Sequence, residues 1–270
     1  MKRVSLLIVL LALALLVAPQ ASATVYNLAD GNSTLKIDSG SEAGAYGWVV
    51  DGTSVLYQQW FWYRIGSTGG EQSIDNLGLL SANVLDASDL RLTYGSTTGL
   101  EVSVLYSLTG GSVNSHMSDT AETILIKNNG STSLDVHFFQ YSDFDLASDL
   151  IDKVAIDPSL QKVVQRPVGS GPILSETVVT PAPQHAEANY YSNTLGKLND
   201  GLPTTLDDVL TAGPGDVTWA FEWDKMLAGG GSFLISKDKN LAPMVPEPAP
   251  LALLGGVLVV LARKFRRCVV

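Results

Sequence analysis

The sequence predicts an all-β protein, an antiparallel two-sheet β-sandwich with an apolar helix at each end. Polar and apolar residues alternate along much of the middle of the chain, as they do in strands that bury one face. Turn signals rich in Gly, Asn and Pro separate these stretches, and helix signals are few. The two ends instead carry uninterrupted apolar runs beside basic residues, which sets them apart from the body.

The first 23 residues have the three parts of a secretory signal peptide. Lys2 and Arg3 are basic, residues 6–18 are apolar, and residues 21–23 form a small-residue cleavage site of the A-x-A kind. We therefore expect signal peptidase to recognise Ala21 and Ala23 and to cleave after Ala23. The exported domain is expected to span residues 24–241.

The strand predictions follow the alternation. Residues 101–108 place Val102, Val104 and Tyr106 on one face. Residues 121–127 and 134–141 flank the turn signal NNGS, and together they predict an antiparallel hairpin. Further strands are predicted at residues 24–28, 34–38, 47–50, 55–65, 90–94, 153–156, 161–165, 176–179, 186–191, 217–223 and 232–236.

One short helix is predicted inside the body, at residues 203–210. Thr204 is placed to cap its first turn, and Asp207 follows three residues later in the pattern of a capping box. A chain with many short strands and one short helix favours a sandwich of two sheets.

The C-terminal tail contains three elements in order. Residues 242–248 form a proline-rich linker that includes Val245, Pro246, Glu247 and Pro248. Residues 249–262 are uncharged, and as a helix they would be about 21 Å long. The cluster that follows is basic, as expected of a cytoplasmic flank; it consists of Arg263, Lys264, Arg266 and Arg267. Residues 249–270 are therefore predicted to be a single transmembrane helix with a basic stop.

This tail resembles the PEP-CTERM sorting signal of exported bacterial proteins, which membrane proteases called exosortases process. The resemblance implies that an exosortase is a partner, that the inner membrane holds the apolar helix as a sorting helix, and that the folded part lies in the periplasm before it reaches the cell surface or the extracellular matrix. Proteins of this class are associated with exopolysaccharide and biofilm, so exopolysaccharide is an implied partner of the body.

The charge of the body excludes one class of partner. Residues 24–241 contain 11 basic and 26 acidic residues, so nucleic acid is a poor ligand. Cys268, the single cysteine, lies in the predicted cytoplasmic tail, so the exported domain has no disulfide.

Acidic residues crowd into residues 143–157 and suggest one metal site. Asp143, Asp145 and Asp149 are the candidate ligands, because Ca²⁺ binds six to eight oxygen atoms. The spacing does not match an EF-hand, and a solvated acidic loop explains the same residues. No cofactor is expected other than this calcium ion.

Residues 59–64 form the densest aromatic run of the chain. Trp60 and Trp62 would share one face of a strand, where an exposed pair could stack on sugar rings. The alternative is a central strand that is buried on both faces. The three histidines have no metal-binding spacing, and no nucleophile-elbow or P-loop motif is present.

These observations predict a non-enzymatic exported protein with a structural or adhesive role in the matrix. A calcium-dependent carbohydrate-binding module is the first alternative, and it requires exposed tryptophans. A polysaccharide hydrolase is the second, and it requires two carboxylates about 5–10 Å apart across a groove.

Overall fold

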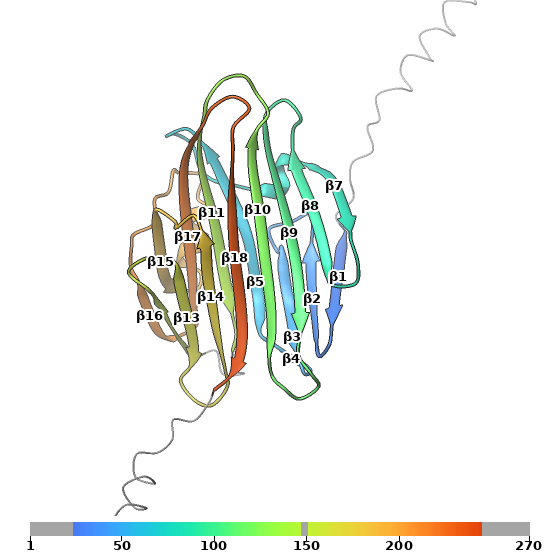
Figure 1. The fold of residues 1–270 in the computed structure, drawn as a ribbon. Coiled ribbons are helices and arrows are strands. Elements are labelled where there is room, and N and C mark those ends of the chain that lie inside the picture. The colour runs from blue at the N-terminus through green and yellow to red at the C-terminus, as the bar shows by residue number, and fades with distance from the viewer. Residues whose placement is uncertain (1–23, 147–150, 245–270) are drawn as a thin grey trace, which may run out of the picture.

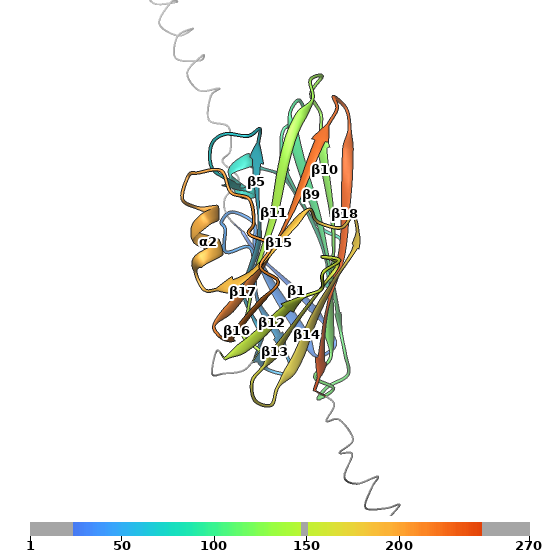
Figure 2. The same ribbon diagram turned by 90° about the vertical axis from the view of Figure 1, so that its left-hand side faces the viewer.

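A computed structural model describes residues 24–146 and 151–244 of the 270-residue chain. Two antiparallel sheets pack face to face, as the two views in Figures 1 and 2 show. Within the described ranges, no helix has the length and apolar character needed to cross a membrane. The predicted signal peptide, the motif at residues 245–248, the apolar tail and Asp149 lie outside the described residues.

The first sheet, called sheet A below, has seven strands in one continuous path. In spatial order these are β1 (Val25–Asp30), β2 (Ser33–Asp38), β3 (Ala45–Val50), β5 (Leu56–Ile65), β11 (Leu134–Phe144), β17 (Val217–Leu227) and β15 (His185–Tyr190). Two short strands lie off this path: β4 (Thr53–Ser54) pairs with β3, and β6 (Gln72–Ser73) pairs with β5.

The second sheet, called sheet B, has nine strands in the described residues. In order these are β16 (Thr211–Gly215), β12 (Asp152–Ile156), β13 (Lys162–Pro167), β14 (Pro172–Thr180), β18 (Ser232–Pro243), β10 (Ser118–Asn128), β9 (Leu100–Gly110), β8 (Asp89–Gly95) and β7 (Leu79–Val84). The predicted alternation is clear in β9, where Val102, Val104 and Tyr106 are buried and the residues between them are half-buried.

The predicted hairpin of residues 121–127 and 134–141 is wrong. Both stretches are strands, but β10 pairs with β9 and β18 in sheet B, whereas β11 pairs with β5 and β17 in sheet A. Residues 129–133 therefore carry the chain from one sheet to the other. Asn128 does not form a hairpin turn. Its side-chain amide instead holds this connection by donating to the carbonyl oxygens of Thr132, Leu227 and Ala228.

The helix predicted at residues 203–210 is also wrong. The described helices are η1 (Ile74–Leu77), a 3₁₀ turn, and α2 (Asn193–Leu198). Residues 203–210 are extended because other groups engage their backbone amides: Leu206 donates to Glu222 and Asp207 donates to Glu187. The segment 192–210, including α2, lies on the outer side of sheet A (Figure 2).

The core lies between the two sheets and is rich in aromatic rings. Phe61 of β5 stacks on Phe138 of β11 with ring centroids 5.6 Å apart, and Phe144 stacks on Trp219 at 5.2 Å. Aliphatic side chains of sheet B, such as Ile124, are buried on the opposite side. Burial of these large side chains is the main stabilising contribution to the fold.

A buried group of four charged residues, called the core quartet below, interrupts this apolar core. Glu122 of β10, Glu176 of β14, and Lys237 and Lys239 of β18 are each at most 1% exposed. The Lys239 ammonium lies 2.8 Å from Glu122, and both lysine ammonium groups lie 3.7 Å from Glu176. Lys237 also forms an ion pair with Glu122, and burial lowers the pKa of Lys237 to about 8.

Candidate functional site

The outer face of sheet A gathers polar side chains from its central strands. The register pairs His137 of β11 with Arg64 of β5 and with Asp224 of β17, so these three side chains share the outer face. Along β11, every second residue from His137 to Asp143 lies on the same face. The segment 192–210, which includes α2, lies over this face (Figure 2).

At the Asp143 end lies a small hollow, called the acidic hollow below. It has a volume of about 210 Å³, and its lining residues are Tyr57, Asp143, Asp145, Tyr191 and Asp216. The three aspartates each offer one carboxylate oxygen, and these atoms lie within 4.8 Å of one another. The structure thus brings together Asp143 and Asp145, which the sequence named as a pair, while the third acid is Asp216.

Burial and mutual repulsion set the charges in the acidic hollow. Asp143 is 2% exposed, and burial, followed by the charges of Asp145 and Asp216, raises its pKa to about 8. Burial and the charge of Asp216 also raise the pKa of Asp145. At neutral pH, Asp143 therefore keeps its proton, and the hollow contains a proton donor beside two further carboxyl groups.

The raised pKa of Asp143 predicts a pH dependence of stability. The folded protein keeps a proton on this carboxyl that the unfolded chain loses, so its contribution to the free energy of unfolding falls as pH rises from about 4 to about 8. Urea unfolding across this range should show a shallower decline for Asp143→Asn than for the wild-type protein. Superimposable pH profiles would contradict the raised pKa.

Two exposed tyrosines flank the acidic hollow. Tyr57 is 57% exposed and Tyr191 is 46% exposed, and their ring centroids lie 6.2 Å apart at an interplanar angle of 85°. Solvent-exposed aromatic rings beside carboxylates combine an apolar surface with hydrogen-bond acceptors. That combination suits a sugar, which has apolar C–H faces and hydroxyl groups at its edges.

The predicted stacking role of Trp60 and Trp62 is wrong. Both side chains are completely buried, and their indole N–H groups donate to Ser73 (2.8 Å) and Asn199 (3.1 Å) inside the protein. The tryptophans of β17 are equally buried. A long aromatic run fits a strand covered on both faces: here Asn199 of the segment 192–210 contacts Trp62, whereas Ser73 and the Tyr94 ring contact Trp60.

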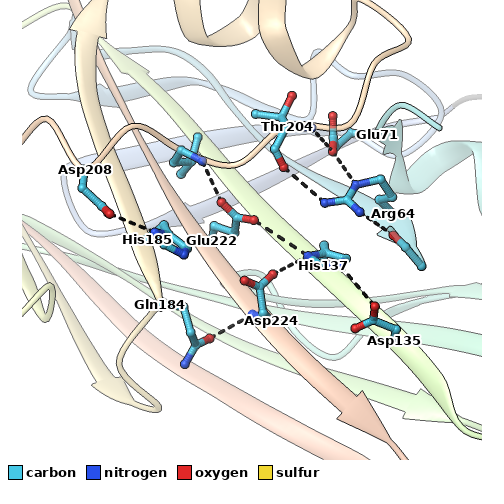
Figure 3. A network of polar contacts seen from close by, with 12 residues as sticks. Arg64, Glu71, Asp135, His137, Gln184, His185, Thr204, Asp208, Glu222 and Asp224 are labelled. Atoms are coloured by element: carbon cyan, nitrogen blue, oxygen red, sulfur yellow. Dashed lines mark hydrogen bonds and ion pairs between the residues drawn. The ribbon is translucent and has the colours of Figure 1, made fainter. Parts of the chain in front are cut away.

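At the His137 end of the outer face of sheet A lies a network of hydrogen bonds and ion pairs, shown in Figure 3. The His137 Nδ1 atom lies 2.5 Å from Asp224 Oδ1 and 3.9 Å from Glu222 Oε1. Glu222 is fully buried and accepts a hydrogen bond from the backbone amide of Leu206 at 2.8 Å. Burial raises the pKa of Glu222 to about 7.

Neighbouring contacts show what this network does. His185 pairs with Asp208 at 2.9 Å, and Arg64 pairs with Glu71 at 2.8 Å while donating to the carbonyl oxygen of Thr204 (Figure 3). The network therefore fastens the segment 204–208 to β5, β15 and β17. His137, Glu222 and Asp224 have the ligand types for a metal ion, but one oxygen of Glu222 is already engaged by the Leu206 amide.

Comparisons with known proteins identify the fold. No family model matches this sequence, and no curated protein matches it. Among solved structures, a putative aldose 1-epimerase from Escherichia coli K12 matches with a TM-score of 0.59 at 12% identity, covering 83% of this chain and 100% of that one. The Slr1438 protein from Synechocystis sp. PCC 6803 matches with a TM-score of 0.53 at 11% identity, covering 84% and 98%.

A bacterial glucoamylase complexed with acarbose matches with a TM-score of 0.54 at 8% identity. That match covers 88% of this chain but 36% of the glucoamylase. The fold is thus shared with a putative aldose 1-epimerase and with part of a glucoamylase. This finding overturns the expectation of a non-enzymatic structural or adhesive body, which rested on the resemblance of the tail alone.

Proposed function

We propose that the exported domain is a carbohydrate-active protein that binds one sugar ring in the acidic hollow and transfers protons at its anomeric centre. The observation that carries this proposal is the lining of the hollow: three aspartates with interacting carboxylates between two exposed tyrosines. The likeness of the fold to a putative aldose 1-epimerase supports the same class of substrate.

Interconversion of sugar anomers fits the charges in the hollow. A base removes the proton from the anomeric hydroxyl, and an acid protonates the ring oxygen as the C1–O5 bond breaks. Rotation about C1–C2 in the open aldehyde and the reverse proton transfers give the other anomer, so no other reactant is consumed. Asp143 is the acid, because its raised pKa keeps it protonated, and Asp216 is the base.

Binding of the sugar tests the proposal first. Tyr57→Ala removes one ring that contacts the sugar, whereas Tyr57→Phe keeps the ring and removes only its hydroxyl group. We expect the alanine variant to bind the preferred aldose about 10-fold more weakly in ligand-observed NMR titrations, and the phenylalanine variant to stay close to wild type. Equal binding by all three proteins would exclude the hollow as the sugar site.

A calcium-dependent form of binding is the second candidate. The clustered carboxylate oxygens repel one another, and a Ca²⁺ ion would relieve this repulsion while sugar hydroxyls complete its coordination. Added Ca²⁺ should then raise the melting temperature. At a Ca²⁺ concentration 100 times Kd, the free energy of unfolding should increase by about 2.7 kcal/mol. EDTA should reverse the shift, and Asp216→Asn should abolish it. A melting temperature that neither Ca²⁺ nor EDTA changes would exclude the calcium-dependent candidate, and the metal-free acid–base function would remain.

The targeting segments complete the proposal. Residues 1–23 act as a signal peptide, and the tail from Val245 onward acts as a PEP-CTERM-like signal for an exosortase, which places the body outside the cytoplasm. The sequence of the two ends supports this. The intact mass of protein from its own host should begin at Thr24 and end near residues 246–248. Replacing Glu247 should block this processing without changing the melting temperature of the body, and a full-length mass would contradict the proposal.

A further inference from the structure

A larger cavity lies at one end of sheet B, where β12, β13 and β16 are neighbours (Figure 2). Its volume is about 1000 Å³, and strands β12 and β13 form much of its wall. Tyr190, at the end of β15, and residues 211–214 complete the lining. This space is large enough for one or more sugar residues.

Three cations line this cavity, which is called the basic cavity below. Lys162 and Arg166 lie two residues to either side of Val164 on β13, so both point outward from sheet B. Lys153 lies opposite Arg166 in the register of β12 and β13 and is also exposed. None of the three forms an ion pair with any described residue, because no carboxylate oxygen in the described ranges lies within 4.0 Å of their nitrogen atoms.

The charge of the basic cavity is opposite to that of the rest of the domain. Asp157 is the one acidic side chain among its described lining residues; hydrogen bonds from Ser159, and then the charge of Lys162, lower its pKa. Residues 24–241 contain 11 basic and 26 acidic residues, yet three of the basic ones meet here. Three cations that form no ion pair among the described residues and face an open space favour an anionic ligand.

The basic cavity and the acidic hollow are neighbours. Tyr190 lines the cavity and Tyr191 lines the hollow, so the backbone at the end of β15 separates the two spaces. On the adjacent strands, Pro214 lines the cavity and Asp216 lines the hollow. An extended ligand that passes around this edge of the sandwich, where β15 and β16 end, would contact both spaces.

We propose that the basic cavity binds the negatively charged residue of an anionic polysaccharide, such as a uronic acid or a sulfated sugar. The neighbouring uncharged sugar then occupies the acidic hollow, because the aspartates there would repel a second negative charge. The inference deepens the proposed function and rests on it for the role of the hollow. The ligand class is thus a glycan in which charged and neutral residues alternate.

A hyaluronan tetrasaccharide has this alternation and is the probe. Calorimetric titration at low ionic strength should show binding to the wild-type protein, weakened by added salt, and no comparable binding of the carboxyl-reduced tetrasaccharide. The variant Lys153→Gln/Lys162→Gln/Arg166→Gln should bind the charged form about 30-fold more weakly or worse. Equal binding of the charged and reduced forms would overturn the proposal.

A matched control separates local contacts from overall charge. The variant Lys36→Gln/Arg91→Gln/Lys127→Gln has the same net charge but alters residues outside the cavity lining. It should bind the tetrasaccharide like the wild-type protein, and an equal loss in both triple variants would contradict a specific site. Inorganic sulfate is the second probe: binding of sulfate without binding of the glycan would show a small-anion site and overturn the proposal.

Tyr57→Ala distinguishes the two proposals. If the proposed function fails but the basic cavity binds glycans, tetrasaccharide binding will depend on the three cations and not on Tyr57. If the basic cavity fails, neutral aldoses will still bind in the acidic hollow, and changing Lys153, Lys162 and Arg166 will have no effect.

Discussion

Asp143→Asn should lower the rate at which the protein interconverts sugar anomers by about 100- to 10,000-fold. The protonated carboxyl of Asp143 is the proposed donor to the ring oxygen, and an amide of the same shape cannot supply that proton. Because Asp143 is buried and its pKa is about 8, the neutral asparagine replaces a side chain that is itself largely neutral at pH 7. The variant should therefore fold normally.

Asp119→Asn is the matched control for this experiment. Asp119 lies on β10 of sheet B, and its pKa is also raised, to about 7, by partial burial and by the neighbouring Asp238. The control should retain the wild-type rate, since Asp119 does not line the acidic hollow. An Asp143→Asn variant that folds and keeps its full rate would remove Asp143 from the mechanism.

Glu122→Gln should produce the largest loss of stability, about 3–5 kcal/mol in the free energy of unfolding. Glu122 is the carboxylate closest to both lysines of the core quartet. Its replacement leaves two buried ammonium groups with Glu176 as the remaining carboxylate of the quartet. Chemical denaturation of the wild-type protein and the variant measures the difference directly.

The double variant Glu122→Leu/Lys237→Met removes one charge of each sign. Lys239 then keeps Glu176 as a partner, and two apolar side chains of similar volume fill the vacated space. We expect it to be far less destabilised than Glu122→Gln, because the cost arises from an unpaired buried charge and not from the loss of a contact. Equal losses in the single and double variants would contradict this account.

Alternation of polar and apolar residues predicted most of the strands, because a strand that buries one face alternates regardless of its partner, but it did not predict β7 or β16. Pairing was not predictable in the same way. The NNGS turn between β10 and β11 is as compatible with a crossing between two sheets as with a hairpin, and the structure has the crossing. Long-range register also brought Asp216 to Asp143, since β17 pairs with β11 about 75 residues away in sequence.

The parts of the site formed by residues close in sequence could be predicted. The parts formed by residues that only the fold brings together could not. Asp143 lies in β11 and Asp145 follows its last residue, so the two are close in sequence and their proximity could be inferred. Tyr57 and Tyr191 come from distant segments and had no local signal. Trp60 and Trp62 were considered as an exposed platform because the sequence did not reveal the distant residues that contact them, such as Tyr94 at Trp60 and Asn199 at Trp62.

The most direct test of the central claim is exchange NMR between the α and β anomers of a panel of aldoses, with and without the purified domain. The account predicts that at least one aldose interconverts faster with the wild-type protein than in buffer, and that Asp143→Asn abolishes the acceleration. An exchange rate equal to that in buffer for every aldose would contradict the proposed chemistry of the acidic hollow.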